Sequence, residues 1–117
     1  DTKIVLCHAG SPADRSEQGL EKWSRDLRLL SDMDNIFCKL SGLGMFDHNW
    51  TENSIAPIVN ECLQQFGPSR CMFGSNFPVD SLYSDYSSLI KAYRNIIPKL
   101  ASETVFDKTA RDFYKIH

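Results

Sequence analysis

Three short apolar runs alternate with segments of helical spacing, and this alternation constrains the fold more than any other feature. The runs are Lys3–His8, Asn35–Gly42 and the start of Cys71–Asp80. Each is almost continuously apolar, as expected for a parallel strand covered on both faces. After each run, apolar residues recur every three or four positions. The predicted order is therefore β-α-β-α-β-α-α, which implies a parallel α/β sheet with right-handed crossovers.

Helix starts and stops can be assigned within this order. Pro57 suits the second helix if that helix begins near Ile55, because proline is tolerated in a first turn. Gly67 and Pro98 mark ends of the second and third helices. The expected N-caps of the four helical segments are Ser16, Thr51 or Ser54, Ser84 and Ser102.

Three parallel strands alone make a poor domain. Helices of consecutive right-handed units would all pack on one face, and the strands beginning near Lys3 and Arg70 would both be apolar edges. Additional strands that close a TIM-like (β/α)₈ barrel of about 250 residues would solve both problems. The chain also enters a strand almost directly after Asp1. We therefore expect residues 1–117 to be about three βα units, the C-terminal portion of a single barrel domain.

Composition excludes several classes of partner. The net charge of −2 is too small to indicate binding to nucleic acid or to an anionic membrane surface. The apolar runs are too short to cross a membrane, and no signal or transit segment opens the sequence. These features favour a cytoplasmic protein with a small-molecule substrate, and they leave a homo-oligomer open.

The four cysteines are predicted to be free. Cys7, Cys38, Cys62 and Cys71 include no Cys-x-x-Cys pair, and all four lie in apolar runs or on an apolar helix face. Buried thiols in a reducing compartment explain this pattern. A zinc site built from Cys7, His8 and Cys38 is an alternative, although the spacing gives it no support.

All three predicted strands end in polar residues. These are His8 on the first strand, Lys39 with Ser41 on the second, and Asn76 followed by Asp80 on the third. The carboxyl ends of parallel strands lie at one edge of a sheet, where α/β proteins place their active sites. We therefore expect these side chains to converge.

Several roles are open for these side chains. His8 could bind a metal or act as a general base. Lys39 could hold a substrate carboxylate or stabilise an oxyanion, and its strand either lines a polar cavity or is an exposed edge. Asp80 could ligate a metal, act as a base, or cap the turn to Ser84. The sequence contains no Ser-His-Asp motif, phosphate loop or metal-binding His pair.

The loop from Leu43 to Trp50 follows the second strand and is expected at the same edge. Loops in this position carry function when a rigid scaffold holds them. His48 and Trp50 are thus candidate substrate-binding residues, together with Lys39 and Ser41. The alternative is a surface loop in which Trp50 packs on the next helix.

Four stretches resemble one family of enzymes. The stretches are Cys7–Pro12, Lys39–Gly44, Met72–Asp80 and Phe106–Tyr114, and together they extend over essentially the whole chain. They resemble the metal-dependent hydrolases of the amidohydrolase-2 family, most closely the lactonase-like branch with fuconolactonases and pyrone-dicarboxylate lactonases. The last stretch has Thr109 where the family usually has Asn.

The resemblance implies a distorted (β/α)₈ barrel, with these strands as roughly the sixth to eighth, and hydrolysis of a lactone or related carboxyl derivative. His8 matches an active-site His of the family, which could also be a metal ligand. Asn76 stands where an Asp is common, often the general base that activates water. An amide cannot accept that proton and is a weaker metal ligand. Either Asp80 replaces the missing acid, the mechanism differs, or activity is lost.

The resemblance leaves cofactor and activity open. A divalent metal such as zinc is implied by the family, yet some members work without one, and the family's first-strand His-x-His pair is not in this sequence. The leading hypothesis is a lactonase-like hydrolase of which this piece alone is inactive. The alternatives are a decarboxylase on the same fold, which would need Lys39 as its carboxylate clamp, and a non-catalytic barrel that serves as a binding or scaffold protein, which Asn76 favours.

Overall fold

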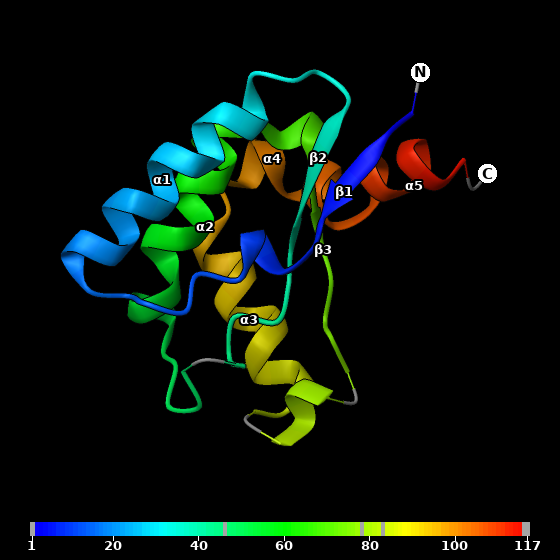
Figure 1. Ribbon diagram of the computed structural model, residues 1–117. Helices are drawn as coiled ribbons and strands as arrows, with labels where there is room; N and C mark the ends of the chain where they lie inside the picture. Colours follow the sequence, from blue (N-terminus) through cyan, green and yellow to red (C-terminus); the bar gives the residue numbers. More distant parts are fainter. Residues whose placement is uncertain (1, 46, 78, 83, 116–117) are drawn as a thin grey trace.

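The computed structural model describes residues 2–45, 47–77, 79–82 and 84–115. Its centre is a three-stranded parallel sheet in the order β1-β2-β3 (Figure 1). The strands are β1 (Ile4–Leu6), β2 (Ile36–Leu40) and β3 (Cys71–Phe73). The register places Ile4 beside Ile36 and Cys38 beside Cys71. The predicted parallel α/β sheet is thus confirmed, although each strand is shorter than its apolar run.

Helices connect and follow the strands in the predicted order. They are α1 (Glu17–Ser31), α2 (Glu52–Phe66), α3 (Tyr86–Ile96), α4 (Lys99–Glu103) and α5 (Thr109–Tyr114). Short 3₁₀ turns span Cys7–Gly10, Pro68–Arg70 and Val79–Leu82, and a π-helical turn at Thr104–Lys108 joins α4 to α5. None of the helices in the described residues is long and apolar enough to cross a membrane.

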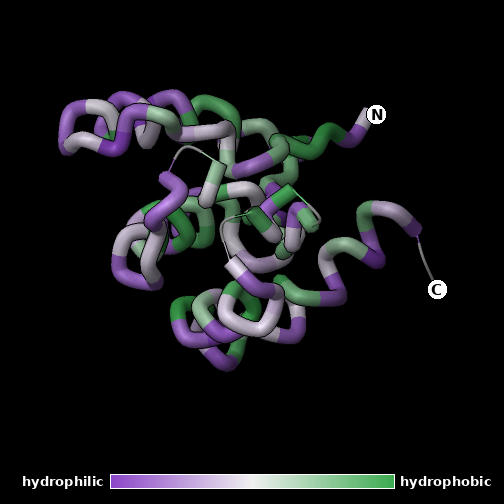
Figure 2. The backbone as a smooth tube through the Cα atoms, turned by 90° about the horizontal axis from the view of Figure 1, so that it is seen from below, coloured by the Kyte–Doolittle hydropathy of each residue, from purple (hydrophilic) through white to green (hydrophobic). Residues whose placement is uncertain are grey.

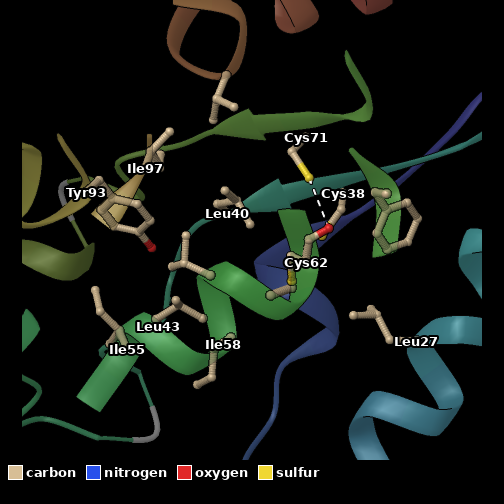
Figure 3. Packing of buried hydrophobic residues seen from close by; sticks show 14 of the residues in the cluster. Leu27, Cys38, Leu40, Leu43, Ile55, Ile58, Cys62, Cys71, Tyr93 and Ile97 are labelled. Carbon is tan, nitrogen blue, oxygen red and sulfur yellow. Dashed lines mark hydrogen bonds between the residues drawn. The ribbon is translucent and has the colours of Figure 1, made fainter. Parts of the chain in front are cut away.

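The hydrophobic core lies between the sheet and the helices α1, α2 and α3 (Figure 3). Ile36, Cys38 and Leu40 are buried, whereas Phe37 and Lys39 between them are only half-buried. This alternation follows from the period of two along a strand. Members of the same cluster on the helices include Leu27, Ile55, Ile58, Cys62 and Tyr93.

The C-terminal segment reaches the opposite face of the sheet. The Phe113 ring on α5 packs edge-on against Phe37, with 5.0 Å between ring centroids. Tyr114 lies near Lys39, whose Nζ is 5.7 Å from the Tyr114 ring centroid. This face was expected to be uncovered, but α5 packs onto part of it. The chain is redirected before this at Ile97 and Pro98, between α3 and α4.

Two of the predicted helix caps are confirmed. The Ser16 hydroxyl accepts a hydrogen bond from the amide of Gly19 at 3.1 Å. Thr51 rather than Ser54 caps α2, and the Ser54 hydroxyl accepts from the Thr51 amide in return, which completes a capping box.

Two other predicted caps are wrong. Asp85 caps α3 in place of Ser84, because its carboxylate accepts from the amide of Ser88 at 2.7 Å. Ser102 lies inside α4, which begins at Lys99 directly after Pro98.

Other local predictions also need correction. Pro57 lies in the second turn of α2, since the helix begins at Glu52 and not near Ile55. The buried side chains of the last segment are Val105 and Thr109, and the Thr109 hydroxyl donates to the carbonyl of Pro68 at 2.8 Å. Cys7 is exposed, whereas the other three free cysteines are buried as expected.

Both outer strands are sheet edges. β1 and β3 each pair with β2 on one side only, and Ile4 on β1 remains 49% exposed. In Figure 2 a hydrophobic segment follows the hydrophilic N-terminus and lies near the margin of the molecule. Unpaired apolar edges are templates for pairing with another chain.

We therefore predict that the isolated 117-residue chain self-associates. Its apparent mass in sedimentation velocity should rise with concentration, because the edges of β1 and β3 pair between copies. A Val5→Lys variant, which places a charge on the β1 edge, should shift this equilibrium toward the monomer. A wild-type monomer whose cooperative unfolding is independent of concentration would contradict the prediction.

Candidate functional site

The sequence predicted His8 as the last residue of the first strand. In the structure, His8 lies in a tight turn beyond β1. β1 ends at Leu6, and His8 and Ala9 both adopt left-handed backbone conformations, with φ of 54° each. Such conformations cost about 1–2 kcal/mol per residue. Burial of Ala9 and a 2.8 Å hydrogen bond from the Trp23 indole to the Ala9 carbonyl offset part of this cost. The turn therefore places His8 over the end of the neighbouring strand.

The end of β2 holds the His8 ring. The His8 Nδ1 and the Ser41 hydroxyl are joined by a 2.8 Å hydrogen bond. Gly42, with φ of +63°, lies directly beneath the imidazole, and a Cβ on it would be 2.6 Å from Nδ1. Only glycine allows this approach. With Nδ1 committed to Ser41, the Nε2 atom of His8 is the one left for a ligand or a proton.

Lys39 projects from the central strand of the sheet, so the alternative that its strand is an edge is wrong. Its side chain passes Gly74, where a Cβ would lie 3.1 Å from the Lys39 Cδ. The ammonium group forms no ion pair with the residues that the structure describes. It lies 5.7 Å from the Tyr114 ring centroid, on the half-buried face of β2. A cation with this freedom can bind an anionic ligand group.

Asn76 and Asp80 form a second pair beyond β3. The strand was expected to end at Asn76, but it ends at Phe73. Asn76 instead adopts a left-handed conformation with φ of 56°. Its Nδ2 donates to the Asp80 carboxylate at 2.9 Å and contacts the sulfur of Met45 at 3.3 Å. Asp80 is only 2% exposed. Because a carboxylate only accepts, this bond fixes the amide orientation and leaves the Asn76 oxygen for another partner.

Residues 43–50, which we call the rim loop, connect the two pairs. The Met45 amide donates to the carbonyl of Gly42 at 3.1 Å, beneath His8, while the Met45 sulfur contacts Asn76. Phe46 lies outside the described residues. The structure thus joins His8 with Ser41, joins Asn76 with Asp80, and links these pairs through Met45.

The two remaining predicted site residues lie elsewhere in the rim loop. His48 is exposed, and its Nε2 is 3.1 Å from the carbonyl oxygen of Met45. Trp50 packs against the core cluster. It also lines an open pocket of about 430 Å³ that none of His8, Lys39 and Asn76 reaches. The other residues that line this pocket are Glu52, Ser84, Asp85, Ser88, Lys91 and Ala92.

Sequence reasoning missed Arg15, Met45 and Tyr93. Arg15 contacts the rim loop. Tyr93 is buried, and burial together with the charge of Asp80 raises the pKa of its phenol. No signal singles out Arg15, which looks like any loop cation before a helix. Tyr93 fits the apolar stripe of its helix, and only its hydroxyl group hints at a polar neighbour.

The cysteines do not form the zinc site that the sequence left open. Cys7 is exposed while Cys38 is buried. The neighbouring Cys62 thiol, together with burial, raises the pKa of Cys38, and the Cys38 thiol together with burial raises the pKa of Cys71. Among the described residues, none of these cysteines belongs to a group of three side chains placed to hold a metal ion.

Metal binding by this part of the chain rests on very few donors. Among the described residues, no group of three His, Cys, Asp or Glu side chains is placed to hold a metal ion. The free Nε2 of His8 and the oxygen of Asn76 are suitable donors for zinc, although the amide is a weak one. These residues fit part of a coordination sphere but do not build a complete site.

Comparison with known proteins gives a consistent picture. The sequence matches the family described as Amidohydrolase over residues 1–116. An uncharacterised protein of Sinorhizobium fredii is 38% identical over 119 residues, covering 99% of this chain and 40% of that protein. An L-fucono-1,5-lactonase of Burkholderia multivorans is 36% identical over 104 residues, covering 77% of this chain and 35% of that protein.

A solved structure shares the fold. The crystal structure of an amidohydrolase from Burkholderia multivorans with bound zinc is 29% identical, with a TM-score of 0.90. The match covers 99% of this chain and 45% of that one. The chain thus spans about 40% of the length of the curated relative that it matches over 99% of its residues.

Alanine substitutions at two glycines test the close approach of the His8 ring to Gly42. In the full-length protein, Gly42→Ala should displace the imidazole and change the ¹⁵N shifts of His8, because the new Cβ would meet the ring at 2.6 Å. Gly67→Ala is the matched control, since Gly67 also has a positive φ but nothing within 4 Å of its Cβ position. Gly42→Ala should lose about 1–2 kcal/mol of stability from backbone strain. Gly67→Ala should lose about 1–3 kcal/mol, because its φ of 79° and ψ of 159° are strongly unfavourable for residues other than glycine. Unchanged His8 shifts in Gly42→Ala would refute the contact.

Proposed function

The chain belongs to the amidohydrolase family, and on that premise we propose that the whole protein hydrolyses a lactone or a related carboxyl ester. The observation that carries the proposal is a pair of polar contacts beyond the carboxyl ends of the parallel strands: His8 is hydrogen-bonded to Ser41, and Asn76 to Asp80. The lactonase among the relatives supports the choice of substrate class. We propose further that these residues are the C-terminal part of a (β/α)₈ barrel, which the open edges of β1 and β3 support.

In the proposed reaction, a water molecule attacks the lactone carbonyl carbon. The new bond joins the water oxygen to that carbon, the ring C–O bond breaks, and a proton from the water ends on the departing alkoxide. His8 Nε2 is suited to move this proton because Ser41 holds the other ring nitrogen. The Lys39 ammonium group can stabilise the oxyanion or bind a carboxylate of the substrate.

Asp80 is proposed to replace the acid that Asn76 lacks. Its Oδ1 accepts from the Asn76 amide, which leaves Oδ2 to accept a proton. Because Asp80 is almost fully buried, this proton must reach it through an intervening water or through movement of the rim loop. Asn76 then presents its oxygen to the substrate or to a metal.

A bound divalent metal would lower the pKa of the attacking water and polarise the carbonyl. His8 Nε2 and the Asn76 oxygen are the donors that this part of the chain would offer. Zinc is bound in the related Burkholderia structure. We propose that the other ligands come from the part of the relatives that this chain does not cover.

The first test is turnover by the full-length protein on a panel of sugar and dicarboxylate lactones, with and without a chelator. His8→Ala and Asp80→Ala should each lower kcat by about 10²-fold or more, as expected for loss of acid–base catalysis. Asp80→Asn keeps an acceptor for Asn76 but removes the base, so it should be as inactive as Asp80→Ala.

Two outcomes would change this assignment. If Asp80→Asn retains activity, Asp80 only positions Asn76. If the folded wild type turns over no lactone with or without added zinc, the hydrolase proposal fails for this substrate class. The pairing of Asn76 with Asp80 would then favour the non-catalytic binding protein.

A second test concerns the charge of the substrate. Lys39→Met should raise KM for dicarboxylate lactones by about tenfold to hundredfold, because a hydrogen bond to a charged group is worth about 1.5–3 kcal/mol. Neutral sugar lactones should change much less if Lys39 binds a carboxylate. Lys22→Met, on the exposed face of α1, is the matched control. Equal loss on both substrate classes with kcat reduced would instead assign Lys39 to the oxyanion.

A further inference from the structure

Arg15 is a cation with several contacts beyond the carboxyl ends of the strands. It lies in the loop between β1 and α1, directly before the N-cap, and its side chain is only 15% exposed. Its Nε donates to the carbonyl of Pro12 in its own loop at 3.0 Å. Its Nη2 donates to the carbonyl of Leu43 at 2.6 Å, and its Nη1 lies 3.8 Å from the Asp47 carboxylate. One guanidinium thus joins the loops that follow two different strands.

The contacts of Arg15 bracket Met45. Leu43 and Asp47 lie on either side of it in the rim loop, and the Met45 sulfur contacts the amide of Asn76. The contacts of Arg15 with Leu43 and Asp47 therefore restrain the position of Met45, which contacts Asn76. Lysine could not do this, because its single ammonium group cannot reach acceptors in three directions from one rigid plane.

The environment of Arg15 is energetically demanding. Burial lowers the pKa of Arg15, whereas the nearby Asp47 and Tyr93 raise it. Its Nη1 is buried and has no hydrogen-bond partner among the described residues. An unsatisfied buried donor weakens a fold, so a surface arginine would be the more stable arrangement. A costly buried cation is typical of a residue that serves a site rather than stability.

We propose that Arg15 is a positioning residue that holds the rim loop and, through Met45, the amide of Asn76. The inference rests on the proposed function where it concerns catalysis. The holding of the loop itself does not depend on which reaction the protein performs.

The test uses the full-length protein with Arg15→Met and Arg15→Lys, and Arg25→Met on the exposed face of α1 as the matched control. Hydrogen–deuterium exchange of residues 43–45 and 47–50 should be about tenfold faster in Arg15→Met, since two anchoring contacts of the loop are lost. Exchange within α1 and β2 should stay at the wild-type level. Arg15→Lys should give intermediate protection, and Arg25→Met none of these changes.

Turnover supplies the second readout. If the protein is a lactonase, Arg15→Met should raise KM and lower kcat in the folded enzyme, with partial rescue by Arg15→Lys. Unchanged loop exchange in Arg15→Met, or a uniform rise over the whole chain, would overturn the inference. A wild type that turns over no lactone, yet shows the localised change in exchange, would refute the proposed function and leave the role of Arg15 intact.

Discussion

The central position of β2 is the constraint on which the rest of the structure depends. It pairs with β1 on one side and β3 on the other, and its buried Ile36, Cys38 and Leu40 form the floor of the core. The strand therefore cannot shift by one residue without moving this apolar set to the wrong face. The same register places Lys39 on the opposite face and places Ser41 at the edge of the sheet, where it is hydrogen-bonded to His8. Packing and site geometry are thus set by one strand.

Left-handed residues beyond the outer strands direct the polar side chains. His8 and Asn76 both have positive φ, and each makes a side-chain contact that a continuing strand would not allow. Such conformations are unfavourable for residues other than glycine and persist only where surrounding contacts enforce them. Here the enforcing contacts are the Ser41 hydroxyl and the Asp80 carboxylate. Their recurrence at two strand ends supports a functional rather than an accidental origin.

The polar network behind these ends links three segments that are distant in sequence. Arg15 before α1 contacts Leu43 and Asp47 of the rim loop, and Met45 of that loop contacts Asn76 beyond β3. Buried polar groups specify geometry when their partners are present, and they weaken the fold when a partner is missing. The network therefore trades stability for a fixed arrangement of the loops. This trade is reasonable where a substrate must meet Asn76 and His8 in one orientation.

The sequence by itself determined the element order, the parallel sheet and the capping by Ser16, because these depend on local periodicity and on residues a few positions apart. It also indicated that His8, Ser41, Asn76 and Asp80 lie at strand ends. Only the tertiary structure decided which of them meet, since a hydrogen bond across 33 residues leaves no periodic trace. The roles of Arg15 and Met45 were hidden for the same reason. A charged or apolar residue in a loop acquires its partner only when the strands before and after it are brought side by side.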